Sequence, residues 1–177
     1  MTVAQRFTTE FVDYEDRLRI SAELPGNQVV LLWITRRLLD RLVSHLAGLL
    51  ERETATAPVP EVQQSFAQQA AQAEHQQQSQ EQPQPPVVPE QAQTVHEWLV
   101  REVDLTPGKQ GVNLRFRGVT PDQVVELGMP ALLLRQWLGI VHGQYRRAQW
   151  PLDPWPEWMN EDKTTTIGSG DSGGVFH

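Results

Sequence analysis

Polar and apolar side chains alternate at the start of the chain and then change to a helical spacing. Residues 5–12 ("QRFTTEFV") and 16–24 ("DRLRISAEL") follow a period of two, which predicts strands with one buried face. The turn sequence "LPGN" precedes the apolar run "QVVLLWI" at residues 28–34, which predicts a buried strand. Thr35 is the expected N-cap of a helix. The apolar stripe of that helix is Leu38, Leu39, Leu42, Val43, Leu46, Leu49 and Leu50.

The same pattern returns later in the chain. Residues 95–105 ("VHEWLVREVDL"), 111–119 ("GVNLRFRGV") and 124–129 ("VVELGM") are expected strands, with turns between them. Pro130 suits the first turn of a second helix. Its apolar stripe is Leu133, Leu134, Trp137, Leu138, Val141 and Tyr145.

A shift of 95 residues superimposes the two parts. Gln28, Val29 and Val30 then fall on Gln123, Val124 and Val125, and "LL" at 38–39 falls on "LL" at 133–134. We interpret this match as an internal duplication of a strand-strand-strand-helix unit. The predicted fold class is α+β, with antiparallel sheets and two amphipathic helices. Residues 1–53 and 95–150 would form the two repeats and pack together as one pseudo-symmetric domain.

The two expected repeats are joined by residues 54–94, which are rich in Gln, Ala and Pro. Such a composition buries little apolar surface, so a disordered, flexible linker is the first prediction. The alternative is a transient helix over residues 61–78 that docks a partner, because Ala and Gln favour helices. Residues 151–177 are expected to form a Trp/Pro segment and a flexible acidic tail.

Composition restricts the kind of site that the chain can hold. It contains no cysteine, which excludes disulfides and thiolate metal sites. The net charge of −7 lies mostly in residues 54–94 and 151–177, each with a net charge of −4. The N-terminus has no apolar signal region and no apolar run is long enough for a bilayer, so a cytoplasmic protein with no membrane contact is expected.

The sequence offers no candidate catalytic residue and no cofactor or metal site. The stretch "GDSGG" at residues 170–174 resembles the surroundings of a protease nucleophile, but only five residues follow Ser172. No histidine pairs with another ligand at metal-binding spacing. We therefore expect a protein that is not an enzyme.

Two arginine pairs are the first candidate binding residues. In the strands "RLR" and "RFR", Arg17 and Arg19 share one face, as do Arg115 and Arg117. These side chains could bind an anionic partner or nucleic acid, since arginine grips phosphates and carboxylates in a forked geometry. The alternative is cross-strand ion pairing with carboxylates on a solvated face. The candidates for that pairing are Glu10, Glu23, Glu97 and Glu102.

Three tryptophans in "QWPLDPWPEWM" are the second candidate. Trp150, Trp155 and Trp158 lie among prolines that prevent a regular element. They either fill a groove between the repeats or form an exposed aromatic docking patch.

The tandem strand-rich repeat with a terminal helix resembles, in topology alone, the Pur-type and Whirly-type single-stranded nucleic-acid binders. That resemblance implies binding through basic and aromatic sheet faces. The acidic linker and tail argue against a phosphate backbone as the main ligand. The sequence therefore favours a non-enzymatic interaction, adaptor or assembly protein of a bacterial-type cytoplasm. We expect a protein partner and consider a homo-oligomer, with nucleic acid as the alternative ligand.

Overall fold

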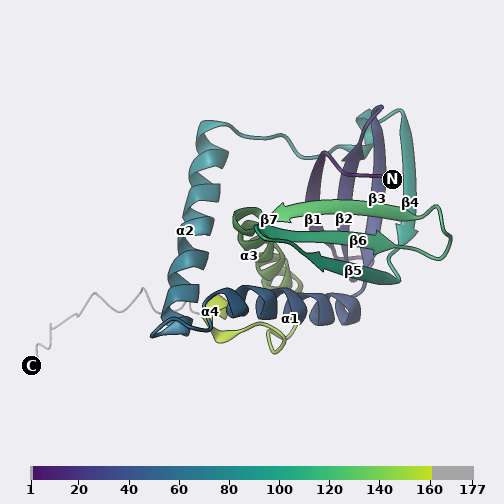
Figure 1. Cartoon of the computed structure of the whole chain (residues 1–177). Coiled ribbons are helices and arrows are strands. Elements are labelled where there is room, and N and C mark those ends of the chain that lie inside the picture. Colours follow the sequence, from purple (N-terminus) through teal and green to yellow (C-terminus); the bar gives the residue numbers. More distant parts are fainter. Residues whose placement is uncertain (1, 161–177) are drawn as a thin grey trace, which may run out of the picture.

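The first part of the chain folds as its hydrophobic pattern predicts. The computed structural model describes residues 2–160, and it contains β1 (Arg6–Val12), β2 (Arg17–Leu24) and β3 (Gln28–Ile34) as an antiparallel meander (Figure 1). The β2–β3 turn needs positive φ angles, 79° at Gly26 and 55° at Asn27. The helix α1 (Arg36–Glu53) follows, and the Thr35 side chain accepts a hydrogen bond from the Leu38 amide, which confirms the predicted N-cap.

The second part has the same order of elements. It contains β5 (Glu102–Pro107), β6 (Gly111–Arg117) and β7 (Val124–Pro130), again antiparallel, and then α3 (Ala131–Ala148). The helices α1 and α3 both have 18 residues, and their first residues are 95 positions apart. The fold class α+β is thus confirmed. The duplication itself stays an interpretation of the sequence match, because a shared order of elements does not establish a common origin.

The predicted strand at residues 95–105 is wrong as a single element. The structure divides it into β4 (Thr94–Leu99), which pairs in parallel with β3, and β5, which belongs to the other sheet. The chain changes sheets at one peptide: the Val100 amide donates to the Trp33 carbonyl, and the Arg101 amide donates to the Arg117 carbonyl, each over 2.8 Å. The sheets are therefore β1-β2-β3-β4 and β5-β6-β7.

One core lies between the two sheets and their helices. The strands of the sheets run crosswise in Figure 1, with α1 and α3 beside them. The buried side chains of both sheets and both helices form one continuous cluster, and the largest fully buried members include Phe116, Trp137 and Tyr145. The N-terminal residues also join the sheets, because the Ala4 amide donates to the Glu126 carbonyl of β7 and the Gln5 amide donates to Glu23 of β2.

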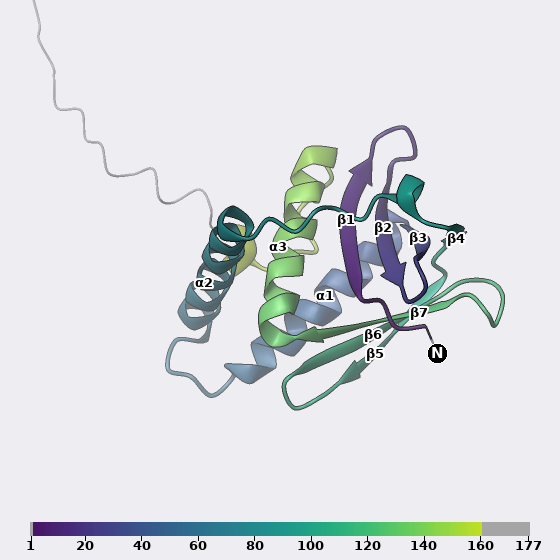
Figure 2. The same cartoon turned by 90° about the horizontal axis from the view of Figure 1, so that it is seen from above.

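The expectation of a disordered linker is not confirmed. Residues 54–94 contain the 22-residue helix α2 (Pro60–Glu81) and a short 3-10 helix, η1 (Pro89–Gln91). Gln64, Gln68 and Ala71 are buried on the side of α2 that meets α3. The prediction from composition failed because this helix packs on the rest of the protein mainly through hydrogen bonds of its amide side chains, rather than through apolar side chains. Figure 2 shows the following segment crossing from α2 past α3 and β1 toward η1 and β4.

Two further features complete the described chain. The short helix α4 (Glu157–Asn160) contacts α2 and includes Trp158, so the prediction that the prolines prevent any regular element in the Trp/Pro segment is wrong at its end, where no proline follows Pro156. None of the helices within residues 2–160 has the length and apolar character that a membrane crossing requires. The stretch "GDSGG" lies outside the described residues.

Candidate protein-docking face

The outer face of the sheet β1–β4, on the side away from the core, carries an unusual group of buried apolar side chains. Strand alternation directs Leu18 and Ile20 of β2 into the core and Arg17 and Arg19 outward. On β3, however, the side chains on both faces are buried. Val29 and Leu31 are 3% and 6% exposed and form a small cluster that is separate from the main core.

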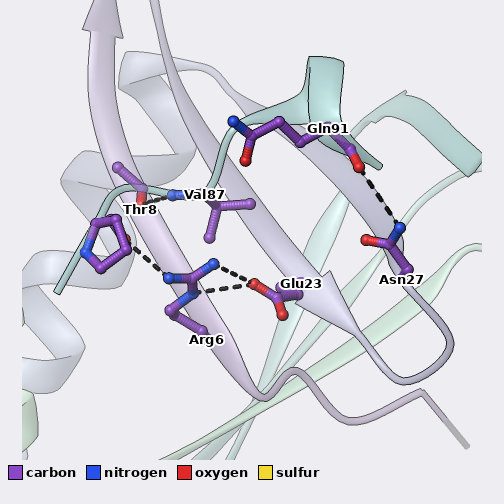
Figure 3. A network of polar contacts seen from close by, with 7 residues as sticks. Arg6, Thr8, Glu23, Asn27, Val87 and Gln91 are labelled. Atoms are coloured by element: carbon purple, nitrogen blue, oxygen red, sulfur yellow. Dashed lines mark hydrogen bonds and ion pairs between the residues drawn. The ribbon is translucent and has the colours of Figure 1, made fainter. Parts of the chain in front are cut away.

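A segment of the same chain, which ends in the 3-10 helix η1, covers this cluster. We call residues 82–93 the strap. The strap places Val87, which is 6% exposed, against Val29 and Leu31. Figure 3 shows that β1 holds the strap backbone: Arg6 Nη1 donates to the Pro85 carbonyl, and the Val87 amide donates to Thr8 Oγ1, each over 2.9 Å.

The strap is also fixed at its C-terminal end. Asn27 Nδ2 donates to the Gln91 carbonyl over 3.4 Å, and the Gln93 amide donates to the Asn27 carbonyl over 3.0 Å. Arg6 is oriented toward the strap by Glu23, whose Oε2 accepts from Arg6 Nε over 2.9 Å. The strap therefore lies in one defined register on the sheet.

The rest of this face is partly open. Arg19 forms an ion pair with Glu10 of β1, and its guanidinium lies 5.7 Å from the ring centroid of Trp33 in a cation–π arrangement. Val95 of β4, the residue opposite Val29, is 44% exposed. Because β4 is the last strand of the sheet order, the apolar strip reaches the edge of the sheet.

The predicted arginine pairs lie on outer faces, but the structure does not bring them together as one anion site. On the other sheet, Arg115 pairs with Glu126 at 2.6 Å, and Arg117 pairs with Asp104 at 2.7 Å and with Glu102 at 3.5 Å. The Arg115 hydrogen bond lowers the pKa of Glu126 below its ordinary value. Cross-strand pairing was the alternative that the sequence offered, and two of its candidate carboxylates, Glu10 and Glu102, do pair with these arginines. Glu23 pairs with Arg6 instead, and Asp104 and Glu126 were not among the candidates.

Arg17 differs from the other three arginines. Among residues 2–160 we find no ion pair of its guanidinium, and it lies at the start of β2 opposite Val12. It is the one predicted site arginine whose charge is not matched by a carboxylate in the described part of the chain.

The three tryptophans are buried, so the exposed docking patch is not supported by the structure. Trp150, Trp155 and Trp158 are 7%, 5% and 6% exposed and belong to the main core cluster. Trp150 packs edge-on against Phe11 at 5.4 Å and against Tyr145 at 5.1 Å. The prolines direct the chain back over α3, and the indoles cover apolar surface that the helices leave open.

Sequence reasoning missed the contact between α2 and α3. Gln68 Nε2 donates to the Arg135 carbonyl over 2.8 Å, and Gln136 Nε2 donates to the Ala71 carbonyl over 3.3 Å. Arg135, 7% exposed, donates to Gln64. The sequence does place glutamines on one side of the helix, but glutamine in a helix is ordinarily exposed to solvent, so this pattern did not indicate a buried contact.

Two hollows in the described part of the chain lie outside this face. A cavity of about 300 Å³ where α1, α2 and α4 meet is lined by Glu51, Glu61, Glu157 and Trp158, among others. An open depression of about 730 Å³ over the sheet β5–β7 contains the paired Arg115 and Arg117. Within the described part of the chain, no three His, Asp or Glu side chains are grouped so that they could hold a metal ion.

Comparison with protein-family models, with curated proteins and with solved structures finds no match to this chain.

Proposed function

We propose that this chain is a non-enzymatic protein-interaction protein, and that the outer face of β1–β4 docks an extended segment of a protein partner. One observation carries the proposal: this face already holds an extended peptide, the strap, through contacts from Arg6 and Thr8 to its backbone. In peptide recognition, hydrogen bonds to the peptide backbone provide affinity and pockets for single side chains provide specificity. The exposed Val95 extends the apolar strip beyond the strap.

The charge distribution favours a protein over nucleic acid as the partner. Three of the four predicted arginines, Arg19, Arg115 and Arg117, are each paired with a carboxylate. A guanidinium in an ion pair must lose its partner before it can neutralise a phosphate. The driving force from counterion release is thereby reduced.

The nucleic-acid alternative is tested by light scattering coupled to size-exclusion chromatography. The chain is run with and without a single-stranded oligonucleotide at low and at high salt. We expect the same mass in all four runs. A complex that dissociates at high salt, and that is lost when Arg17, Arg19, Arg115 and Arg117 become glutamine, would overturn the proposal in favour of nucleic-acid binding.

Docking at the face is tested by site-specific photo-cross-linking in the cells that make the protein. A photoreactive amino acid replaces Val95, which lies on the proposed face, or Val119, which is 73% exposed and lies in the β6–β7 loop. We expect a discrete protein adduct from position 95 and none from position 119. The protein identified in it should then form a complex with the purified chain that persists at high salt. Equal adducts from both positions, or no complex, would contradict docking on this face.

A further inference from the structure

We infer that the strap is an internal ligand, and that the outer face of β1–β4 is a binding site for Pro-Pro-Val segments of partner proteins. The inference rests on the proposed function and names the chemistry of the partner. In the free chain, Pro85, Pro86 and Val87 of the strap occupy the site. A partner segment with the same features displaces them.

The two prolines of the bound segment favour the extended backbone that the site accepts. Proline fixes φ near the value of a polyproline II helix and restricts the preceding residue to extended conformations. Pro85 and Pro86 are therefore arranged for binding before contact, and little backbone entropy is lost on docking. The Pro85 carbonyl, which has no competing helix or strand partner, accepts from Arg6 Nη1 over 2.9 Å.

The third position of the motif must be apolar and must carry an amide hydrogen. The Val87 amide donates to Thr8 Oγ1, so proline cannot replace this valine. Its side chain is buried against Val29 and Leu31, so a charged residue would be desolvated without a partner. Position 87 thus provides an apolar anchor, while Arg6 and Thr8 fix the register.

The strap buries little of its own surface, as a displaceable ligand would. Residues 82–86 are exposed, Val87 is buried, and Val88, Pro89 and Ala92 are half-buried. The contacts to Arg6 and Thr8 would be the same for a segment of another protein. The strap has an advantage over a partner segment because it belongs to the same chain, which gives it an effective concentration on the order of millimolar.

The test is a binding titration with a fluorescent peptide that has the sequence of residues 82–93. The protein is the full chain, either unchanged or as the Val87→Asp variant, whose strap carries a charge at the apolar anchor. We expect the peptide to bind the Val87→Asp variant about tenfold or more tightly than the unchanged chain, because the internal competitor is weakened. Val119→Asp adds the same charge at an exposed position and should bind like the unchanged chain.

Variants of the face and of the peptide locate the binding. In the Val87→Asp background, Thr8→Val removes the acceptor of the anchor amide and should weaken binding about fivefold. Alanine in place of the valine that corresponds to Val87 should weaken it about tenfold. Lys109→Gln also removes one positive charge, at an exposed position in the turn between β5 and β6 of the other sheet, and should leave the affinity unchanged.

Two results would overturn the inference. The first is no binding to the Val87→Asp variant, or to a Val87→Ala variant that avoids a buried charge, while amide NMR spectra show a folded sheet. The second is binding that does not respond to Thr8→Val or to the alanine peptide. In either case, a cross-linked adduct from position 95 and none from position 119 would still support the proposed function. Salt-sensitive oligonucleotide binding would contradict both the proposed function and this inference.

Discussion

Arg135 of α3 and Gln64 of α2 share a hydrogen bond within the protein interior: Arg135 Nη2 donates to Gln64 Oε1 over 2.8 Å. Gln64 is 1% exposed, and its amide nitrogen also donates to the carbonyl of Leu50, in the last turn of α1. Carbonyls in that turn have no partner within their own helix. One side chain therefore connects three helices. Burial lowers the pKa of Arg135 from its ordinary value, and the charge of Glu53 opposes that shift.

Removing the Gln64 amide should destabilise the fold. Gln64→Ala leaves the Arg135 guanidinium and the Leu50 carbonyl buried without this partner, so we expect a loss of about 2–3 kcal/mol in the free energy of unfolding. Gln63→Ala changes an exposed neighbour on the same helix and should alter it by less than about 0.5 kcal/mol. Urea denaturation compares the two. Equal midpoints would show that α2 is not held by this amide.

The helix α2 marks where prediction from composition fails. The rule that Gln-rich segments are disordered assumes that only apolar side chains can hold a helix on a core. Here Gln64 and Gln68 donate to backbone carbonyls of α1 and α3 respectively, and only Ala71 adds a buried apolar side chain. Those acceptors exist only in the folded tertiary structure, so a sequence pattern cannot reveal them.

The regular elements were predicted well where the hydrophobic pattern of an element is clear. The bounds of β3 agree with the apolar run at residues 28–34, and Thr35 caps α1 as expected. The boundary between β4 and β5 was missed because the polarity of residues 95–105 gives no sign of a change of sheet. That change depends on Trp33 and Arg117, which accept from Val100 and Arg101 and lie far away in the sequence.

The candidate face was partly visible in the sequence. Alternation placed Arg17 and Arg19 outward, and the structure agrees. The unbroken apolar run of β3 also implied that both of its faces are covered. What covers the outer face could not be predicted, because Val87 reaches Val29 and Leu31 only through the path that the strap takes after α2.

Replacing the buried Trp150 should lower the stability of the fold. Its ring packs on Phe11 and Tyr145, and its Nε1 donates to Asp16 Oδ1 over 3.1 Å. Trp150→Ala is expected to lower the free energy of unfolding by about 3–5 kcal/mol. Phe66→Ala removes an aromatic ring that is 69% exposed and should change it by less than about 0.5 kcal/mol. If Trp150→Ala were as harmless in thermal denaturation as Phe66→Ala, the Trp/Pro segment would not be part of the core.

Two glycines of the second sheet should differ sharply in their tolerance of a methyl group. A Cβ on Gly111 would lie 2.2 Å from the Met129 carbonyl oxygen and 2.7 Å from the Pro130 Cα, and these backbone atoms cannot move aside easily. Gly111→Ala should therefore destabilise the chain by about 1–3 kcal/mol or more. A Cβ on Gly128 meets nothing within 4 Å, so Gly128→Ala is the matched control. Hydrogen exchange of the β6–β7 amides should rise in the first variant alone.

The contact between Tyr145 and Asp40 joins α3 to α1 and should make stability depend on alkaline pH. Tyr145 is fully buried, and its hydroxyl donates to Asp40 Oδ1 over 2.7 Å. Burial, followed by the hydrogen bond to Asp40, raises the pKa of Tyr145 well above its ordinary value. The folded state therefore holds this proton more tightly than the unfolded state.

Its stabilisation is complete below about pH 10, where an unfolded tyrosine is also neutral, and is lost progressively as the pH rises above that value. Tyr145→Phe keeps the ring but removes the hydrogen bond, so we expect a loss of about 1–2 kcal/mol near neutral pH. The same variant should lose less stability than the unchanged chain between about pH 10 and pH 11.5. Denaturant titrations across that range measure both effects. The only other tyrosine, Tyr14, is 80% exposed, and Tyr14→Phe should follow the unchanged chain at every pH. A Tyr145→Phe variant with the same alkaline slope as the unchanged chain would mean that another group causes the loss.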